Sequence, residues 1–151
     1  MSNNFWNNRK VLVSGGTGFI GSHVVEKLVE KGANVSVLDN LQNGFIKNIA
    51  YLKDQVRFIK GNCTDEKDAL KACKDQQVVM NLAARVGGIE YNRTHQATML
   101  RDNLLIAVKM LEAARQANVE RFLVISSACV YPHDVFVPTP ESEGFRGEPE
   151  E

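Results

Sequence analysis

A glycine-rich segment near the start of the chain constrains its fold more than any other feature. Residues 15–21 read GGTGFIG, and they join an apolar run at residues 11–13 to a helix-like stretch at residues 23–31. Glycine at every third position allows a sharp turn, a close approach of the backbone to a ligand, and tight packing of the new helix on its strand. The free amides and the dipole at the start of such a helix favour an anion. The segment therefore predicts a strand–loop–helix unit that wraps a pyrophosphate.

An acidic residue after the second expected strand supports a dinucleotide ligand. Residues 35–38 are apolar and lead to Asp39, which lies 18 positions past Gly21. A carboxylate at this place accepts hydrogen bonds from the ribose hydroxyls of adenosine. It also repels a 2′-phosphate, and no arginine stands beside it, so the sequence favours NAD over NADP. The alternative is an α/β domain with a tight turn and no ligand.

The order of apolar and amphipathic segments predicts the fold class. Helices are expected at residues 19–31, 65–73 and 94–118, with Gly32 as a stop signal and Thr64 as an N-cap. Short apolar runs predict five strands, at residues 10–14, 34–38, 56–60, 77–81 and 122–126. These runs are nearly continuous, as in strands that are buried on both faces of a parallel sheet. We therefore expect an α/β chain with a Rossmann-type, doubly wound parallel sheet.

Composition limits the partners and the compartment. Eighteen basic residues balance 18 acidic ones, so no net field attracts the chain to nucleic acid or to an anionic membrane. No apolar stretch approaches the roughly 20 residues of a membrane span. The three cysteines lack Cys-x-x-Cys spacing, which fits a reducing compartment and predicts a cytoplasmic protein. The three histidines have no ligand spacing, so no metal site is expected.

A change in composition near residue 132 divides the chain. All four prolines lie between residues 132 and 149, and the last 11 residues include five glutamates. We expect a nucleotide-binding domain at residues 1–131 and a loop at residues 132–151. A loop of this length at the end of a compact domain is unusual unless more chain follows.

Six motifs in order resemble the extended short-chain dehydrogenase/reductases, also called NAD-dependent epimerases/dehydratases. The resemblance runs from about residue 10 to residue 132, and this family acts on nucleotide-activated sugars. Its markers are GGTGFIG at 15–21, DN at 39–40, GNCTD at 61–65, NLAA at 81–84, DN at 102–103 and SSACVYP at 126–132. RVGGI at 85–89 together with SACVYP looks most like the GDP-fucose synthase and GDP-mannose 3,5-epimerase branch. The Asp-Glu pair of the 4,6-dehydratases is missing here, which disfavours that branch.

The resemblance implies a cofactor contact for each of the first five motifs. It places the pyrophosphate on Gly15, Gly18, Phe19, Ile20 and Gly21, the ribose on Asp39 and Asn40, adenine on Asn62 and Cys63, and other contacts on Leu82, Ala83, Ala84 and Asn103. The family usually has aspartate at position 62, where asparagine can still make an amide contact. GDP-fucose synthases commonly use NADP, so Asp39 favours the epimerase side of the branch.

The sixth motif carries the catalytic residues that the resemblance implies. Ser127 corresponds to the active-site serine, which would hydrogen-bond the sugar oxygen at the carbon that exchanges a hydride. Cys129 corresponds to an acid/base thiol, which would move a proton at the carbon beside the ketone. The alternative for both residues is packing at the end of a strand, where small side chains are common.

The family also relies on a Tyr-x-x-x-Lys pair, which this sequence does not contain. The residues four places after Tyr51, Tyr91 and Tyr131 are Gln55, His95 and Val135. The resemblance implies that residues 132–151 are part of an active-site loop, cut before the last strands of the sheet and before a substrate domain. We therefore expect the chain to be the NAD-binding part of a nucleotide-sugar epimerase/dehydratase, with a GDP-sugar favoured, and to be inactive alone. The resemblance also implies a homodimer for the full-length enzyme, formed through the long helix. The alternatives are a UDP-sugar 4-epimerase or decarboxylase, and a non-catalytic NAD-binding module.

Overall fold

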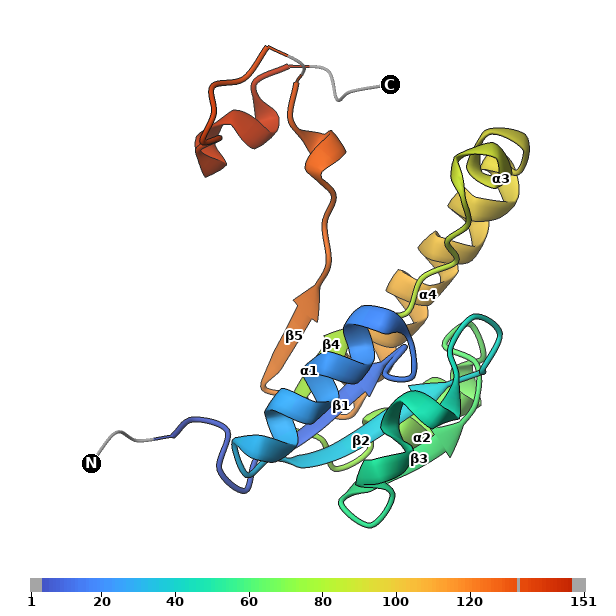
Figure 1. Ribbon diagram of the computed structural model, residues 1–151, viewed down its shortest axis with the longest axis vertical. Coiled ribbons are helices and arrows are strands. Elements are labelled where there is room, and N and C mark those ends of the chain that lie inside the picture. The colour runs from blue at the N-terminus through green and yellow to red at the C-terminus, as the bar shows by residue number, and fades with distance from the viewer. Residues whose placement is uncertain (1–3, 133, 148–151) are drawn as a thin grey trace.

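The computed structural model describes residues 4–132 and 134–147, which build on a five-stranded parallel sheet (Figure 1). The strands are β1 (Lys10–Ser14), β2 (Asn34–Asp39), β3 (Val56–Lys60), β4 (Val78–Asn81) and β5 (Arg121–Val124). Their order in the sheet is β3-β2-β1-β4-β5, and every pair is parallel. The order reverses between β1 and β4, which makes this the switch point of a doubly wound sheet. The predicted Rossmann-type fold is confirmed.

Helices cover both faces of the sheet. α1 (Phe19–Glu30) and the 3₁₀ helix η1 (Ile46–Leu52) pack together and supply Val25 and Ile49 to one half of the core. α2 (Glu66–Cys73) and α4 (Gln96–Gln116) pack together against the opposite face. Short helices complete the described chain: α3 (Ile89–Thr94), η2 (Ala128–Val130) and η3 (Glu141–Phe145).

The central strand shows why the apolar runs do not alternate. Val11 and Val13 of β1 belong to the core on the α1 face, whereas Leu12 packs with Met110 of α4 on the other face. Successive residues of a strand point to opposite faces, so a strand between two helical layers needs apolar residues at every position. The side chains of Val11, Leu12 and Val13 are fully buried. This position of β1 fixes the place where the glycine-rich segment begins.

The long helix predicted at about residues 94–118 is present as α4, and a short helix that was not predicted, α3, precedes it. The chain is helical in α3, breaks at His95, and is helical again in α4, which ends at Gln116. At the break, Thr94 Oγ1 donates a hydrogen bond to the Glu90 carbonyl oxygen at 2.9 Å, and His95 has φ −125°. Polar side chains that bond the nearby backbone compete with a continuing helix, and the apolar periodicity does not record that competition.

Other bounds differ more modestly from the predicted ones. Asp65, and not Thr64, caps α2, because its carboxylate accepts a hydrogen bond from the Asp68 amide at 3.0 Å. β5 ends at Val124 rather than at residue 126, and the expected loop at 132–151 contains η3. Residues 133 and 148–151 of that expected loop lie outside the described residues. No described helix combines the length and the apolar character that crossing a membrane requires.

Exposed apolar side chains gather on α4 and on β5, which contact each other. We call this the α4–β5 surface. Its residues are Leu104, Leu105, Val108, Leu111, Leu123, Val124 and Ile125, with exposed fractions from 40% to 59%. β5 pairs only with β4, so its outer edge has no strand beside it in the described chain, and the segment after β5 rises away from the sheet (Figure 1).

Candidate functional site

Three loops meet at the switch point of the sheet. The glycine loop (residues 15–18) follows β1, the β2 loop (residues 40–45) follows β2, and the β4 loop (residues 82–88) follows β4. The strands are parallel and β1 lies between β2 and β4, so the glycine loop lies between the other two. In open α/β sheets ligands bind outside the carboxyl ends of the strands at this point.

Two glycines are required where the backbone approaches itself. A Cβ at Gly21 would lie 2.1 Å from the carbonyl oxygen of Gly15, closer than any real Cβ contact. Gly15 has φ +69°, and a Cβ there would lie 2.9 Å from the Cα of Ala83. Gly15 therefore allows the turn and brings β1 against the β4 loop. Gly21 lets α1 pass close to the glycine loop. The turn at Gly15 and the close packing of α1 at Gly21 were expected from the sequence, whereas the approach of a phosphate to this backbone stays a prediction.

The first turn of α1 has backbone donors without protein partners. Gly18 precedes α1, no side chain caps the helix, and its first turn holds no acidic residue. Ser22 donates to the Gly18 carbonyl at 3.0 Å, whereas the amides of Phe19 and Ile20 have no hydrogen-bond partner among the described residues. A helix start with open amides and a positive dipole end is suited to an anion. The glycine loop therefore fits the diphosphate of a dinucleotide.

Asp39 is buried at the end of β2 and is held by two backbone amides. Its Oδ2 accepts a hydrogen bond from Thr17 N at 3.1 Å, and its Oδ1 accepts one from Leu41 N at 2.9 Å. Only 7% of the residue is exposed. Each oxygen retains a free lone pair, so a bond to a ribose hydroxyl stays a prediction. The structure adds a second role that the sequence did not indicate: Asp39 links the glycine loop to the β2 loop.

Thr17 is the main link between the glycine loop and the β2 loop. Its carbonyl oxygen accepts hydrogen bonds from Phe45 N at 3.1 Å and from Asn48 Nδ2 at 2.9 Å. Gly44 packs against it so closely that a Cβ there would lie 2.1 Å from Thr17 Oγ1. Thr17 Oγ1 itself is buried, with no hydrogen-bond partner in the part of the chain that the structure describes. Nothing in the spacing of these residues distinguishes them from an ordinary loop, so the sequence does not predict this contact.

On the other side of β1, buried polar groups fix the start of the β4 loop. Ser14 Oγ donates to Asn81 Oδ1 at 2.6 Å and accepts from the amide of Ala83 at 3.2 Å. The amide of Leu82 donates to the Ser14 carbonyl at 3.2 Å. These bonds hold Leu82 and Ala83 beside Gly15, and a contact of either residue with the cofactor stays a prediction. Ala84 follows them and is exposed.

Asn103 of α4 holds the next residue of the β4 loop. Its Oδ1 accepts a hydrogen bond from Arg85 N at 2.7 Å, and its Nδ2 donates to the Arg85 carbonyl at 3.1 Å. The Arg85 side chain donates to the Tyr91 hydroxyl at 2.8 Å and pairs with Asp102 at 2.7 Å. The guanidinium groups of Arg101 and Arg85 lower the pKa of the Asp102 carboxyl. A contact of Asn103 with the cofactor stays a prediction, and its observed partner is the loop.

Asn62 and Cys63, the predicted adenine contacts, lie in different environments. Asn62 is exposed, and its side chain accepts a hydrogen bond from the Thr64 amide at 3.0 Å. Cys63 is 5% exposed and packs in the core between β2 and α2. Burial and the nearby Asp39 carboxylate raise the pKa of Cys63 to about 12. An adenine contact stays a prediction for both, and the Cys63 thiol contributes packing to the core.

Ser127 and Cys129 lie together, but not beside the glycine loop. Both are exposed, and Ser127 Oγ accepts a hydrogen bond from Cys129 N at 3.1 Å at the start of η2. Figure 1 shows η2 well above the end of the sheet, on the segment that continues from β5. Asn40, the remaining predicted contact, is exposed and turns the β2 loop by accepting a hydrogen bond from the Gln42 amide at 2.9 Å.

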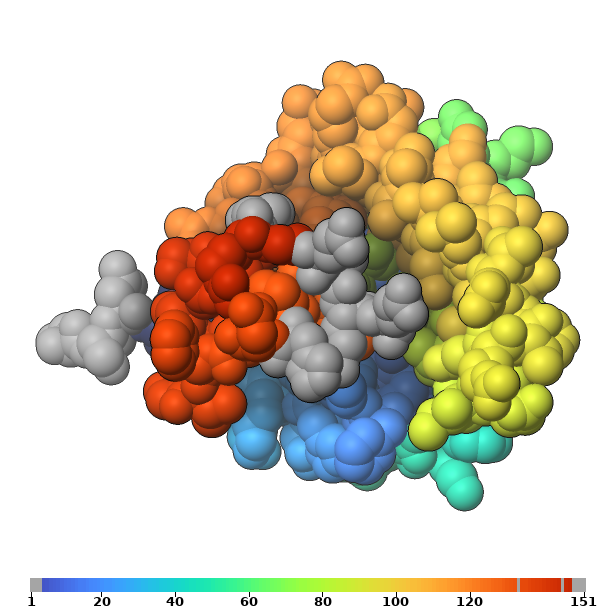
Figure 2. Space-filling model, turned by 90° about the horizontal axis from the view of Figure 1, so that it is seen from above, coloured from blue at the N-terminus to red at the C-terminus, as the bar shows by residue number. Residues whose placement is uncertain are grey.

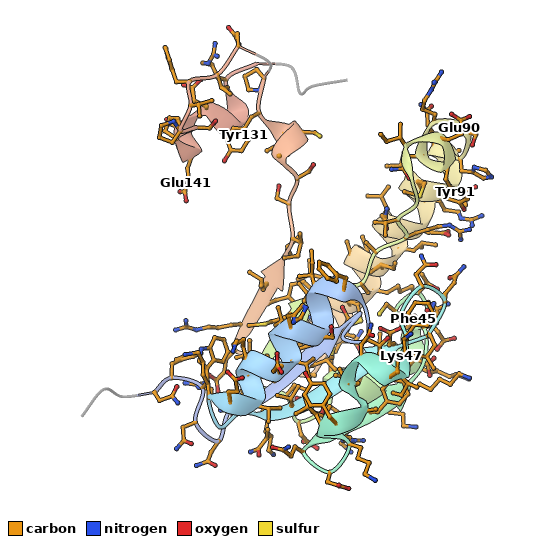
Figure 3. All side chains as sticks on the ribbon, viewed as in Figure 1. Phe45, Lys47, Glu90, Tyr91, Tyr131 and Glu141 are labelled. Carbon is orange, nitrogen blue, oxygen red and sulfur yellow. The ribbon has the colours of Figure 1, made fainter. Side chains whose placement is uncertain are left out.

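The face at which the strands end is flanked by separate parts of the chain. Seen from above in Figure 2, the segment after β5 (orange to red) lies opposite α3 and the start of α4 (yellow). Figure 3 shows Tyr91 of α3 on the same side of the molecule as Phe45, and Tyr131 with Glu141 on the other side. Among the described residues, no three His, Cys, Asp or Glu side chains form a group that could hold a metal ion.

Comparisons with known proteins agree with this arrangement. The family model of the NAD dependent epimerase/dehydratase family matches residues 11–149. GDP-mannose 3,5-epimerase 1 of Oryza sativa subsp. indica is 31% identical over 97% of this chain. The epimerase of Methanothermobacter thermautotrophicus superposes with a TM-score of 0.84 at 32% identity over 93% of this chain. UDP-glucose 4-epimerase of Thermotoga maritima superposes with a TM-score of 0.78 at 33% identity, also over 93% of this chain.

The matched proteins are much longer than this chain. It spans 40% of the rice protein, 42% of the Methanothermobacter protein and 44% of the Thermotoga protein.

Proposed function

The chain belongs to the NAD dependent epimerase/dehydratase family, and from this premise we propose that it binds NAD across the switch point of its sheet. The observation that carries the proposal is the glycine loop. Gly15 and Gly21 leave no room for a side chain, and the amides of Phe19 and Ile20 are open to an anion. Asp39 at the end of β2 supports NAD over NADP, because its carboxylate disfavours a 2′-phosphate.

Each loop has a role in holding the cofactor. The glycine loop and the start of α1 hold the diphosphate, and Asp39 with Asn40 holds the adenosine ribose. Leu82, Ala83 and Ala84 line the approach to the nicotinamide half, beside Gly15. When bound, NAD takes up and returns a hydride at a sugar carbon.

The substrate that we propose is a nucleotide sugar, with a GDP-sugar favoured. The motifs RVGGI and SACVYP support this choice, and the rice relative is named for GDP-mannose. Within the longer protein, Ser127 orients the sugar oxygen, and Cys129 holds and moves a proton at the neighbouring carbon. Because the 151 residues contain no lysine four places after a tyrosine, we expect this chain to bind NAD with little or no turnover of its own.

Two alternatives have their own support. The Thermotoga relative is a UDP-glucose 4-epimerase at comparable identity, which supports a UDP-sugar 4-epimerase, and a UDP-sugar decarboxylase belongs to the same alternative. The missing Tyr-x-x-x-Lys pair supports a non-catalytic NAD-binding module. Adding GDP-sugars and UDP-sugars to the NAD-loaded full-length protein, and recording NADH absorbance, separates the first alternative from our proposal. Absence of any reduction by either class favours the module.

Calorimetric titration of the 151-residue chain with NAD and with NADP tests the proposal directly. We expect NAD to bind at least tenfold more tightly than NADP. Equal binding of the two, or tighter binding of NADP, contradicts the role of Asp39. No binding of either one contradicts the proposed function.

A further inference from the structure

A polar pocket of about 510 Å³ lies at the end of the sheet where β1, β2 and β3 begin. It is lined by the first residues of these strands and by the turn that follows α2. The glycine loop and Asp39 lie at the opposite end of the same parallel strands. The pocket is therefore separate from the candidate cofactor site.

The strand register puts a lysine, a serine and an arginine on one face of the sheet in this pocket. Ser36 of β2 is paired with Arg57 of β3 and, on its other side, with Leu12 of β1. Lys10 lies two residues before Leu12, so its side chain is on the same face. Leu12 packs in the core beneath α2 and α4, which identifies the face. The three polar side chains are therefore on neighbouring strands, on the side of the sheet that α2 covers.

The turn after α2 brings Gln76 to the same pocket. Gln76 N donates a hydrogen bond to the Cys73 carbonyl at 3.1 Å, and Gln77 N donates to the Lys10 carbonyl at 2.9 Å. These backbone bonds tie the turn to the end of α2 and to the start of β1. The position of Gln76 therefore does not depend on its own side chain.

Two buried polar side chains that line the pocket lack partners. Ser36 is 6% exposed, and its hydroxyl makes no hydrogen bond with any described residue. Gln76 is 7% exposed, and its Oε1 is buried with no hydrogen-bond partner in the described chain. Leaving a buried polar group without a partner costs free energy, so such groups are rare and require an explanation. Two of them in one pocket indicate a polar ligand.

The charged residues of the pocket indicate the sign of that ligand. Lys10, Arg57 and Lys74 line it, together with Asp54 and Asp75. None of these five side chains forms an ion pair with a described residue. Three cations against two carboxylates leave a positive excess. An arginine paired across the strands with a serine suits the oxygens of a phosphate.

We propose that this pocket binds a small phosphate ester that carries hydroxyl groups. Arg57, Lys10 and Lys74 hold the phosphate, and the Ser36 hydroxyl donates a hydrogen bond to it. Gln76 Oε1 accepts a hydrogen bond from a hydroxyl of the same molecule. A phosphate dianion offers acceptor oxygens only, so the hydroxyl is a necessary part of the ligand. The inference goes beyond the proposed function and does not depend on NAD binding.

Calorimetric titration of the 151-residue chain with glucose 6-phosphate, glucose and inorganic phosphate tests the proposal. We expect glucose 6-phosphate to bind about tenfold more tightly than glucose or inorganic phosphate, because only the ester engages both the cations and Gln76. Saturating NAD should leave this affinity unchanged, since the two sites lie at opposite ends of the strands.

Arg57→Ala should weaken the binding of glucose 6-phosphate about tenfold, because it removes a hydrogen-bonded cation. Lys60→Ala is the matched control and should leave binding unchanged. Lys60 is an exposed cation on the same strand, it forms no ion pair with a described residue, and it does not line the pocket.

Gln76→Met should weaken the binding of glucose 6-phosphate about fivefold and leave that of inorganic phosphate unchanged. The midpoint of urea unfolding should stay equal or rise, because the exchange removes a buried carbonyl that has no partner in the described chain. A lower midpoint with unchanged ligand affinity would show that Gln76 has a structural role only.

Other results overturn the proposal in distinguishable ways. If none of the three compounds binds at millimolar concentration, the buried groups of Ser36 and Gln76 are hydrated and the pocket is not a ligand site. If Arg57→Ala binds as tightly as Lys60→Ala, or if NAD displaces glucose 6-phosphate, the ester binds elsewhere. If inorganic phosphate binds as tightly as the ester, the contact with Gln76 is wrong. Titration with NAD alone tests the proposed function separately.

Discussion

At the scale of single residues, the glycines of the site differ sharply in what a side chain would meet. A Cβ at Gly21 would overlap the carbonyl oxygen of Gly15 at 2.1 Å, which is backbone and cannot rotate away. A Cβ at Gly88 would meet nothing within 4 Å, and its φ of −70° suits any residue. A glycine of the sequence pattern is therefore required only where the fold brings another segment of the backbone against it.

We expect Gly21→Ala to lower the free energy of unfolding by about 3 kcal/mol and to abolish NAD binding, because α1 must move away from the glycine loop. Gly88→Ala should stay within about 0.5 kcal/mol of the wild type. Urea unfolding followed by circular dichroism measures the free energy of unfolding, and calorimetric titration measures NAD binding. A Gly21→Ala protein of wild-type stability would mean that α1 starts differently from the arrangement described above.

The three cysteines should separate by reactivity. Cys129 is exposed, whereas Cys63 and Cys73 are buried, and burial raises their pKa to about 12 and about 11. Ellman's reagent at pH 8 should label one thiol rapidly in the native chain and three in urea. Cys129→Ser should remove the rapid phase. Rapid labelling of two or more thiols in the native chain would contradict the packing of the core.

Because Cys63 is buried, the free energy of unfolding should fall as the pH rises above 9. The pKa of Cys63 rises from 9.0 to about 12 on folding. Above pH 9 the Cys63 thiol therefore keeps its proton in the folded state and loses it in the unfolded state. The contribution of Cys63 to stability is complete below pH 9 and is lost as the pH rises towards 12. Cys63→Ala should flatten the decline in unfolding free energy between pH 9 and pH 10.5 relative to the wild type.

At the scale of elements, the site is built from loops whose positions are set by other elements. Asn103 lies on α4, yet its side chain replaces the hydrogen bonds that the backbone of Arg85 would otherwise make to water. The β4 loop therefore depends on a helix that follows it in the chain. The same relation holds for the β2 loop, which depends on Thr17 of the glycine loop.

Asn103→Ala should free the β4 loop, since it removes both bonds to Arg85. We expect a loss of about 1–3 kcal/mol in unfolding free energy and faster tryptic cleavage after Arg85, measured by mass spectrometry over time. Asn92→Ala on α3 is the control, because its side chain makes no hydrogen bond in the described residues. Unchanged cleavage in Asn103→Ala would show that Tyr91 and Asp102 hold the loop without it.

The sequence predicted the elements whose signal is local. The bounds of β1 and β3 are those expected from their apolar runs, and α1 ends where Gly32, with φ +79°, stops it. The break at His95 and the turns of η1 and η3 were not predicted, because side-chain bonds to the backbone and contacts with distant residues determine them. Within the site, the spacing of the glycines predicted the glycine loop. The hydrogen bonds through which Thr17 and Asn103 hold the neighbouring loops depend on the order of the strands in the sheet.

At the scale of the whole molecule, the described chain has an open side. The α4–β5 surface exposes seven apolar residues, and among the described residues β5 has no neighbouring strand on its outer edge. An unpaired edge with apolar side chains invites pairing with another chain. We propose that another polypeptide segment packs on this surface, and the resemblance of the long helix to that of the family favours a second copy of the chain.

The 151-residue chain should therefore self-associate at micromolar concentrations, and Val108→Glu on the exposed side of α4 should reduce this association at least tenfold. A charge placed in an apolar contact must be desolvated, so it opposes burial of the surface. Sedimentation velocity across a concentration series measures the effect. Lys67→Glu on α2, an exposed position away from that surface, should leave association unchanged. A monomeric wild-type chain throughout the series would contradict the expectation.

The contact between Thr17 and Gly44 has a consequence for how this protein can be altered. A larger residue at 44 needs a smaller one at 17, and the new pair must still satisfy Asn48, whose amide reaches the same peptide. Engineers who redesign cofactor preference should randomise positions 17, 44 and 48 jointly, since improved variants will carry compensating exchanges that one-at-a-time libraries never sample.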